Sequence, residues 1–334
     1  MLKDIFIQTI KEKGSISFYE YMKTCQEHPA YGYYSTKPSD EILGLEGDFV
    51  TSPEITSLFG EMIAFWVVSQ WDRLGKPFAI NILELGAGRG ILMQDILVTL
   101  TKLKSFASTC QVHVLEINPS FRQLQTKKLH DLCDVTHHAS LDFLNGIQEP
   151  MIIIANEFFD ALPAQQYLKK DDRWYEVYIA VNDLNELQFE YIPYEGVPQN
   201  SEIQPDTITI LDQIYKHIQQ QDGAALIIDY GYWEGNGNTV QALYHHQNVG
   251  VLDYPGEADI SVHVNFQRMA EQADRYELQY AYQTQRQFLM EFGIVLRAQQ
   301  QLQQSNQTLL QCVNRLIDPA EMGYLFKVLQ VWKN

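Results

Sequence analysis

The sequence predicts an α/β fold in which a doubly wound, mostly parallel sheet is covered by helices. From residue 78 onwards, apolar runs alternate with segments of helical period, which is the pattern of parallel strands joined by crossover helices. The run at 151–155 is apolar throughout, as a strand covered on both faces requires. A strand that carries Glu84 near its end turns through three glycines into a helix, as in the first unit of many such sheets.

Six core strands are expected, at residues 78–85, 111–117, 135–138, 151–155, 224–229 and 324–332. Helices are expected at residues 52–74, from the glycines to about residue 103, and at 119–130. Ser52 is a natural N-cap for the first helix and Pro53 suits its first turn. Gly75 and Pro77 follow this helix and end it.

Two further segments interrupt the strand–helix alternation. Residues 174–179 and 187–192 alternate apolar and polar side chains with period two, which indicates antiparallel strands inserted between core strands four and five. Residues 235–264 are rich in Gly, His and Asn, which indicates a long active-site loop. We therefore expect a helical cap at 1–76 that contributes to the pocket, a core at 77–334 and a β-rich insertion at 165–222.

Composition narrows the classes of function. The chain has 334 residues, with 24 Lys and Arg against 42 Asp and Glu, so its formal net charge is −18. Phosphate neutralisation needs clustered Lys and Arg, so general nucleic-acid binding is not expected. The same charge disfavours an anionic membrane surface and is compatible with a cationic substrate.

The cysteines and histidines give no sign of a metal site. None of the four cysteines forms a C-x-x-C pair, and the nine histidines include no H-E-x-x-H motif. No stretch approaches the ~20 apolar residues of a membrane span. The N-terminus lacks a signal peptide, and Asp4 and Glu12 fit a transit peptide poorly. We expect no metal, no membrane span and a cytoplasmic location, or the mitochondrial matrix if the source is a eukaryote.

The glycine loop carries the most informative spacing. Nicotinamide and flavin sites favour G-x-G-x-x-G, with a pyrophosphate at the helix N-terminus, whereas here Gly90 comes one residue early. Glu84 would repel a pyrophosphate but suits the ammonium of S-adenosylmethionine, which has no phosphate. The loop therefore favours S-adenosylmethionine over NAD, and a purely structural turn is the alternative.

Other polar residues at strand ends complete the expected cofactor site. Glu116 follows the second strand, where an acidic side chain accepts hydrogen bonds from ribose hydroxyls. Asp142 follows the third strand and would lie near the adenine amino group. The expected cofactor-binding residues are Glu84, Gly86, Ala87, Gly88, Gly90, Glu116, Ile117, Leu141, Asp142 and Asn156.

Carboxylates also follow strands four and five. Glu157, Asp160 and Asp229 all fall at the expected carboxyl edge of the sheet. An arginine acceptor has delocalised lone pairs and a pKa above ~12, so it needs carboxylates to grip it and to receive a proton. We expect these three residues to be catalytic, with Glu157 the strongest candidate. Alternatively, Asp160 caps a helix and Phe158 is part of the core.

Ordered blocks along most of the chain resemble one family. They are Phe18-Tyr19-Glu20-Tyr21-Met22, the residues 28–34, 47–55 and 59–61, the glycine loop at 84–90, Asn156–Pro163, Ile228–Gly231, Pro255–Ile260, Thr284-Gln285, Phe288-Leu289 and residues 322–329. Together these blocks resemble the MidA-type methyltransferases, a family that includes a mitochondrial complex I assembly factor acting as a protein arginine methyltransferase.

The resemblance implies a Rossmann-like class I methyltransferase fold, S-adenosylmethionine as methyl donor and a protein substrate with an accessible arginine. In the mitochondrial relatives it implies symmetric dimethylation of a complex I subunit. It adds His263 to the catalytic candidates. It also implies a substrate pocket formed by Asp48, Phe49, Thr51, Ser52, Pro53, Glu54, Phe158 and Tyr230.

Two departures from the family pattern bear on this assignment. Ala87 stands where relatives often have proline, and Asn265 stands where they usually have aspartate. If position 265 caps a helix, Asn serves as well as Asp; if it contacts a cationic substrate, one charge is missing. The alternatives are a small-molecule acceptor, an NAD-dependent oxidoreductase and a non-catalytic assembly factor with the same fold. A homodimer is also compatible with the sequence.

Overall fold

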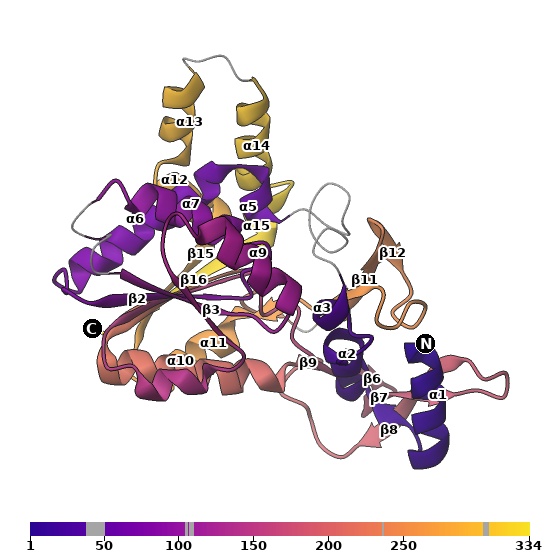
Figure 1. Cartoon of the computed structure of the whole chain (residues 1–334). Helices are drawn as coiled ribbons and strands as arrows, with labels where there is room; N and C mark the ends of the chain where they lie inside the picture. Colours follow the sequence, from indigo (N-terminus) through magenta and orange to yellow (C-terminus); the bar gives the residue numbers. More distant parts are fainter. Residues whose placement is uncertain (38–50, 104–105, 107–109, 236, 303–306) are drawn as a thin grey trace.

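The computed structural model describes residues 1–37, 51–103, 106, 110–235, 237–302 and 307–334. Its centre is a twisted sheet with the strand order β15-β16-β10-β5-β2-β3-β4, and β14 pairs with β10 beside this path (Figure 1). The strands are β2 (Ile80–Leu85), β3 (Cys110–Leu115), β4 (Val135–His138), β5 (Met151–Asn156), β10 (Gly223–Tyr232), β14 (Val264–Asn265), β15 (Gln279–Thr284) and β16 (Phe326–Trp332).

The predicted doubly wound α/β fold is confirmed. The pairs from β10 through β5, β2 and β3 to β4 are parallel, whereas β16 runs antiparallel to both of its neighbours, β10 and β15. All six expected core strands are present. β15 was not expected, because its mixture of Tyr and Gln gives neither an apolar run nor a clean alternation.

Helices cover both faces of the sheet, so neighbouring residues of one strand enter different cores. Ile152 and Ile154 of β5 pack in one cluster with α6 (Ser57–Arg73) and α7 (Ile91–Leu100). Ile153 packs in the other with α10 (Pro205–Gln221) and α11 (Phe266–Arg275). This two-sided burial explains why the strand is apolar throughout.

The helix expected at 52–74 is wrong as a single element. The structure has α5 (Ser52–Ile55) and α6, separated by Thr56 in an extended conformation. The Thr56 hydroxyl accepts a hydrogen bond from the backbone N–H of Leu58, which makes it the N-cap of α6. Ser52 lies inside α5, whose N-cap is Thr51. The apolar spacing continues across the break, so periodicity alone does not show it.

The N-terminal segment packs on an antiparallel sheet of the insertion. α1 (Leu2–Lys13) and α2 (Phe18–Glu27) bury apolar side chains against Val177 and Ile179 of that sheet. Its strands are β1 (Ile16–Ser17), β6 (Gln165–Lys170), β7 (Arg173–Val181), β8 (Leu187–Tyr194) and β9 (Glu202–Ile203). The helix α10 falls in the range expected as insertion, yet it packs on the central sheet.

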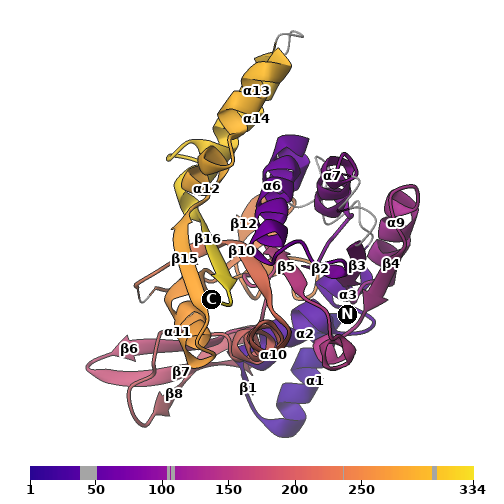
Figure 2. The ribbon, with the colours of Figure 1, turned by 90° about the vertical axis from the view of Figure 1, so that its left-hand side faces the viewer.

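The remaining elements surround the carboxyl edge and the far end of the sheet. The region at 235–264, expected as a loop, contains a small sheet of β11 (Gln241–Tyr244), β12 (Gln247–Val249) and β13 (Asp259–Ser261). Figure 2 shows α13 and α14 projecting away from the central sheet. The other helices are α3 (Tyr33–Thr36), α9 (Pro119–Leu129), η1 (Leu141–Gly146), α12 (Gln285–Glu291), α13 (Ile294–Leu302), α14 (Gln307–Ile317) and α15 (Met322–Leu325).

Candidate active site

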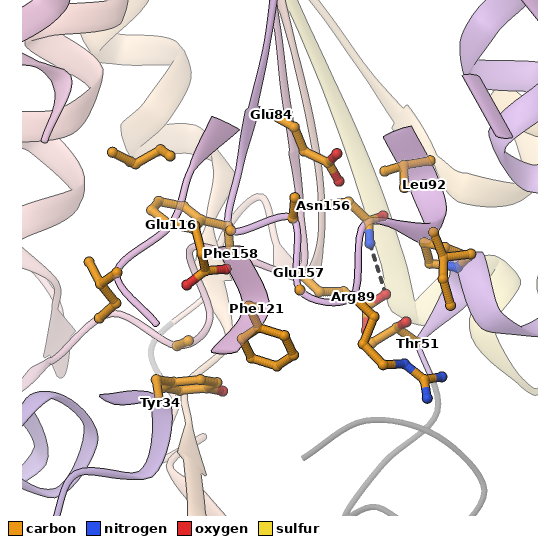
Figure 3. A pocket seen from close by; sticks show the side chains of 18 of the residues that line it. Tyr34, Thr51, Glu84, Arg89, Leu92, Glu116, Phe121, Asn156, Glu157 and Phe158 are labelled. Carbon is orange, nitrogen blue, oxygen red and sulfur yellow. Dashed lines mark hydrogen bonds between the residues drawn. The ribbon is translucent and has the colours of Figure 1, made fainter. Parts of the chain in front are cut away.

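A cavity of about 270 Å³ opens at the carboxyl ends of β2, β3 and β5 (Figure 3). β2 pairs with β3 on one side and β5 on the other, so the strand order reverses there, which is where open α/β sheets bind ligands. The cavity is lined by Gln26, Glu27, Tyr34, Thr51, Pro53, Glu54, Glu84, Gly86, Ala87, Gly88, Arg89, Ile91, Leu92, Leu115, Glu116, Ile117, Phe121, Ala139, Asn156, Glu157, Phe158, Ala161 and Leu162.

The glycine loop presents bare backbone to this cavity. Gly86, Gly88 and Gly90 all have positive φ, at 63°, 49° and 72°. A Cβ added to Gly86 would lie 2.8 Å from Cδ2 of Phe158, so no side chain fits between the loop and that ring. Gly86 and Gly88 line the cavity, whereas Gly90 lies behind them at the start of α7. The loop therefore lets a ligand approach the main chain closely.

Glu84 is a buried carboxylate that lacks a partner. Only 3% of the residue is exposed, and its Oε2 forms no hydrogen bond with the described residues. Burial and the nearby Glu116 carboxylate raise the pKa of Glu84 to about 8. A buried acceptor of this kind is costly unless a ligand donates to it. The site therefore fits the ammonium of an amino-acid moiety beside the glycine loop.

Glu116 is held in place at the end of β3. Its Oε1 accepts from the backbone N–H of Asn118 at 2.8 Å, and its Oε2 accepts from Nε2 of Gln125 at 3.4 Å. The same Gln125 amide donates to the carbonyl of Gly88 at 2.7 Å, which ties the carboxylate to the glycine loop. Carboxylate oxygens can accept further hydrogen bonds, so Glu116 fits the hydroxyls of a ribose.

Glu157 lies at the tip of β5 and lines the cavity. Its φ is +51°, a left-handed conformation that costs energy in any residue with a Cβ and is enriched at functional sites. Its Oε1 accepts from the backbone N–H of Ser52 and from Nδ2 of Asn156, both at 3.0 Å. Burial raises the pKa of Glu157 to about 7, and Glu54 adds to the shift. The carboxyl group is thus poised to exchange a proton near neutral pH.

Asp229, expected as catalytic, does not line the cavity. It is fully buried, and its Oδ2 accepts from the backbone N–H groups of Phe158, Phe159 and Asp160 at 3.0–3.2 Å. Its Oδ1 accepts from the N–H of Tyr230. These bonds fix the turn after β5, so Asp229 positions the chain around Glu157.

Asp160, Tyr230 and His263 form a layer behind the cavity. Asp160 is buried beside the Tyr230 hydroxyl, and burial raises its pKa to about 7. The His263 backbone N–H donates to the Thr239 hydroxyl, and its ring meets the edge of Tyr230. None of the three is among the residues that line the cavity, and their direct contact with an acceptor stays a prediction.

Three other expected site residues, Leu141, Asp142 and Ser52, lie outside the cavity lining. Leu141 is buried in the core under α10 and α11, and Asp142 is exposed on η1, where it accepts from Ser140. Ser52 is buried, and its backbone N–H donates to Oε1 of Glu157, which does line the cavity. Asn265 caps α11 by accepting from the Arg268 N–H at 3.2 Å, the role in which it replaces aspartate without loss. Asp48 and Phe49 fall outside the described residues.

Several lining residues were not identified from the sequence. Arg89 of the glycine loop forms an ion pair with Glu54 of α5 at the cavity wall. Tyr34 also lines the cavity and donates to Oδ1 of Asp259 at 2.6 Å. Phe121 of α9 and Gln26 of α2 complete different sides of the wall. Tyr34 and Arg89 lie in the sequence blocks quoted above, whereas nothing local marks Gln26 or Phe121.

The described residues do not bring three His, Cys, Asp or Glu side chains together as a metal would require. Within the same part of the chain, every helix is too short or too polar to cross a bilayer.

Gly86→Ala is expected to weaken both folding and ligand binding. A Cβ there meets the Phe158 ring and also forces a positive φ on a non-glycine residue, which costs ~1–2 kcal/mol before the clash is added. Gly75→Ala is the matched control, because Gly75 has φ 79° and open space around it. In thermal unfolding with and without S-adenosylhomocysteine, the Gly86 variant should lose more stability than the control and most of its ligand-induced shift. Equal behaviour of the two variants would contradict this role for Gly86.

Asp229→Asn is expected to destabilise the fold by about 3 kcal/mol. In the wild-type protein, Oδ2 of Asp229 accepts from three backbone N–H groups and Oδ1 accepts from a fourth. In the Asn variant an NH₂ group replaces one of these oxygens, so at least one buried N–H faces another donor. Urea unfolding would measure the change, with the exposed Asp142→Asn as control. A loss below ~1 kcal/mol would show that the turn after β5 does not depend on this carboxylate.

Comparisons with known proteins relate most of the chain to methyltransferases. A family model described as "Putative S-adenosyl-L-methionine-dependent methyltransferase" matches residues 62–284. Protein arginine methyltransferase NDUFAF7, mitochondrial, of Rattus norvegicus is 32% identical and covers 95% of this chain and 81% of the relative. The Homo sapiens protein of that name is 31% identical, over 95% of this chain and 80% of the relative. The relatives are named as mitochondrial, so the expected cytoplasmic location is not supported.

Solved structures resemble the whole chain as well. A Burkholderia thailandensis protein crystallised with S-adenosyl-homocysteine has a TM-score of 0.84 at 23% identity, over 99% of this chain and 91% of that one. A native crystal structure from the same organism has a TM-score of 0.82 at 24% identity, over 99% and 90%. At this identity the likeness concerns the fold alone.

Proposed function

We propose that this chain, which belongs to the family of S-adenosyl-L-methionine-dependent methyltransferases, methylates an arginine side chain of a protein substrate. The predicted resemblance to MidA-type methyltransferases is confirmed by the family match and by the near-full-length relatives. S-adenosylmethionine is the cofactor, and when bound it supplies a methyl group activated by a positive sulfur. Glu84, Glu116 and the glycine loop are the groups that would hold it.

The observation that carries the arginine assignment is the buried Glu157 carboxyl in the cavity wall. Ser52 and Asn156 fix it from two sides, both through Oε1. A fixed carboxylate orients a guanidinium through charge-assisted hydrogen bonds, which aligns one nitrogen for attack. The relatives named as protein arginine methyltransferases support the same acceptor.

The proton balance of the reaction also points to Glu157. A guanidinium nitrogen forms a bond to the methyl carbon, the bond from that carbon to sulfur breaks, and one N–H proton must leave. Glu157 can receive this proton, because burial raises its pKa to about 7. Asp229 supports this role indirectly by fixing the turn that carries Glu157.

A labelling experiment tests the proposal. The purified chain is incubated with isotope-labelled S-adenosylmethionine and proteins extracted from its source cells, and labelled residues are located by mass spectrometry. We expect label on arginine nitrogens, and labelling at least ~10²-fold slower with Glu157→Gln. Label on a small molecule or on another side chain would overturn the arginine acceptor, and no label at all would favour a non-catalytic assembly factor.

The finer predictions from the resemblance are tested by the same spectra. Symmetric dimethylarginine releases monomethylamine on fragmentation, whereas asymmetric dimethylarginine releases dimethylamine. The identity of the labelled protein tests whether the substrate is a respiratory complex I subunit. We propose a mitochondrial location if the source is a eukaryote, and a homodimer stays a prediction that sedimentation equilibrium can test.

A further inference from the structure

The antiparallel sheet of the insertion ends in a strand with an open outer edge. β8 pairs with β7 from Trp174↔Tyr194 to Val181↔Leu187, and no other strand in the described ranges pairs with it. Figures 1 and 2 place this sheet at the end of the molecule away from α13 and α14. The N–H and C=O groups along that outer edge are available to an added strand.

The same edge strand exposes apolar side chains. Phe189 and Tyr191 are 41% and 49% exposed on one face, and Ile192 is 37% exposed on the other. Phe189 and Tyr191 line an apolar groove of about 250 Å³ between the sheet and the segment 237–251, together with Phe18, Leu168, Val240 and Val251. An added strand would place alternate side chains in this groove.

The charge along β8 and the segment that follows it is negative. Residues 174–215 contain eight Asp and Glu and no Lys, Arg or His, which accounts for −8 of the net −18. Glu202, Asp206 and Asp212 of this segment accept hydrogen bonds from other parts of the protein. The exposed carboxylates lie along the β7–β8 hairpin and its ends, at Asp183, Glu186, Glu190 and Glu195. Cations beside the hairpin include Arg173, the first residue of β7, and Lys11 of α1, which donates to Asn185.

We infer that β8 and its groove are a docking surface for an extended, basic segment of the protein substrate. The open edge supplies main-chain hydrogen bonds. Glu190 attracts Lys and Arg on one face of β8, and Phe189 and Tyr191 on the other face contact the alternate, apolar side chains of the segment. This inference rests on the proposed function, because it assigns the segment to the protein that carries the methylated arginine.

A second copy of this chain is a poor occupant of the same edge. Antiparallel pairing of two β8 strands would bring the carboxylates of both hairpins together, and like charges across a strand pair are destabilising. An anionic membrane or nucleic acid would be repelled for the same reason. A basic extended peptide can pair with the open edge, fill the apolar groove and complement the negative charge.

The docking surface lies close to the active site along one helix. Phe18 at the start of α2 lines the groove, and Gln26 and Glu27 at its end line the active-site cavity. Nine residues of helix span ~13 Å, a length that ~4 extended residues cover. A substrate docked on β8 therefore needs only a short connection to place an arginine at Glu157.

Fluorescence anisotropy with a labelled (Lys-Val)₅ peptide tests the inference on the full chain. We expect Glu190→Lys to weaken binding about tenfold and Glu186→Lys to act in the same direction. The exposed Glu149→Lys is the matched control, and it should change the Kd less than twofold. Binding should weaken with added salt, and (Glu-Val)₅ should not bind.

Methyl-transfer kinetics separate docking from the proposed function. For the labelled protein substrate, Glu190→Lys should raise KM and leave kcat unchanged, whereas a short acceptor peptide should react equally with both proteins. An unchanged Kd in both hairpin variants, equal binding of the acidic peptide, or a dimer that Glu190→Lys disrupts would overturn the docking surface. If no arginine is methylated, the proposed function fails while the peptide-binding result still decides whether a basic segment docks on β8.

Discussion

Replacing Glu157 by glutamine is expected to lower kcat for methyl transfer by ~10²-fold or more, with little change in the affinity for S-adenosylhomocysteine. Glutamine keeps an oxygen that can accept from the Ser52 N–H and the Asn156 amide, so the tip of β5 should keep its conformation. It carries no charge to orient a guanidinium and cannot take its proton. Steady-state kinetics and ligand titration of the same preparation measure the two effects.

The pH profile gives an independent check on Glu157. Its pKa is raised to about 7, so the carboxyl is protonated below that pH and cannot accept a proton there. With S-adenosylmethionine saturating, the kcat/KM of the wild-type protein for its protein substrate should therefore fall about tenfold per pH unit below 7 and level off above it. The exposed Glu149→Gln should retain the wild-type rate and profile. A flat wild-type profile, or a Glu157→Gln variant with near-normal kcat, would remove Glu157 from the chemistry.

Glu84→Gln is expected to weaken binding of S-adenosylhomocysteine by ~10–100-fold, which is the usual loss for a hydrogen bond to a charged group. The carboxylate has an oxygen without a partner beside the glycine loop, where it can pair with the ammonium of the ligand. Glutamine is neutral, so the charge–charge part of that interaction is lost. Isothermal titration calorimetry measures the affinity. Because the residue is buried, thermal unfolding without ligand is the control for folding, and the Gln variant should be at least as stable as the wild type.

The affinity for S-adenosylhomocysteine should rise with pH, because the pKa of Glu84 is raised in the ligand-free protein. In the ligand-free protein its pKa is about 8, so the group is protonated at pH 6–7.5 and must lose a proton to meet an ammonium. Wild-type affinity should therefore rise about tenfold per pH unit over this range, with release of close to one proton. The Gln variant should show neither the rise nor the release. The same slope in both proteins would contradict the pairing of Glu84 with the ligand.

The sequence located the carboxylates of the site because strand ends are local features. Glu84, Glu116 and Glu157 each lie at or just beyond the end of an apolar run, and parallel strands bring their carboxyl ends to one edge. Their convergence on one cavity follows from that topology. The glycine spacing, together with Glu84, then favoured a cofactor with a cationic amino-acid moiety over one with a pyrophosphate.

The sequence favoured Glu157 but assigned Asp229 a catalytic role as well. Both follow buried strands, yet Glu157 lines the cavity and Asp229 is enclosed by four backbone N–H groups. The choice depends on the direction of each side chain beyond the strand end. That direction is set by the left-handed backbone of Glu157 and by the turn that Asp229 itself holds.

The sequence by itself determined the fold class, the order of the core strands along the chain, the family and the residue types that meet at the sheet edge. These properties depend on periodicity and spacing within short segments. Only the tertiary structure decided that Ser52 reaches Glu157 across 105 residues, that Arg89 pairs with Glu54, and that α2 forms one wall of the cavity. Such contacts join segments far apart in the chain, and they are selected by packing and burial, which no local pattern encodes.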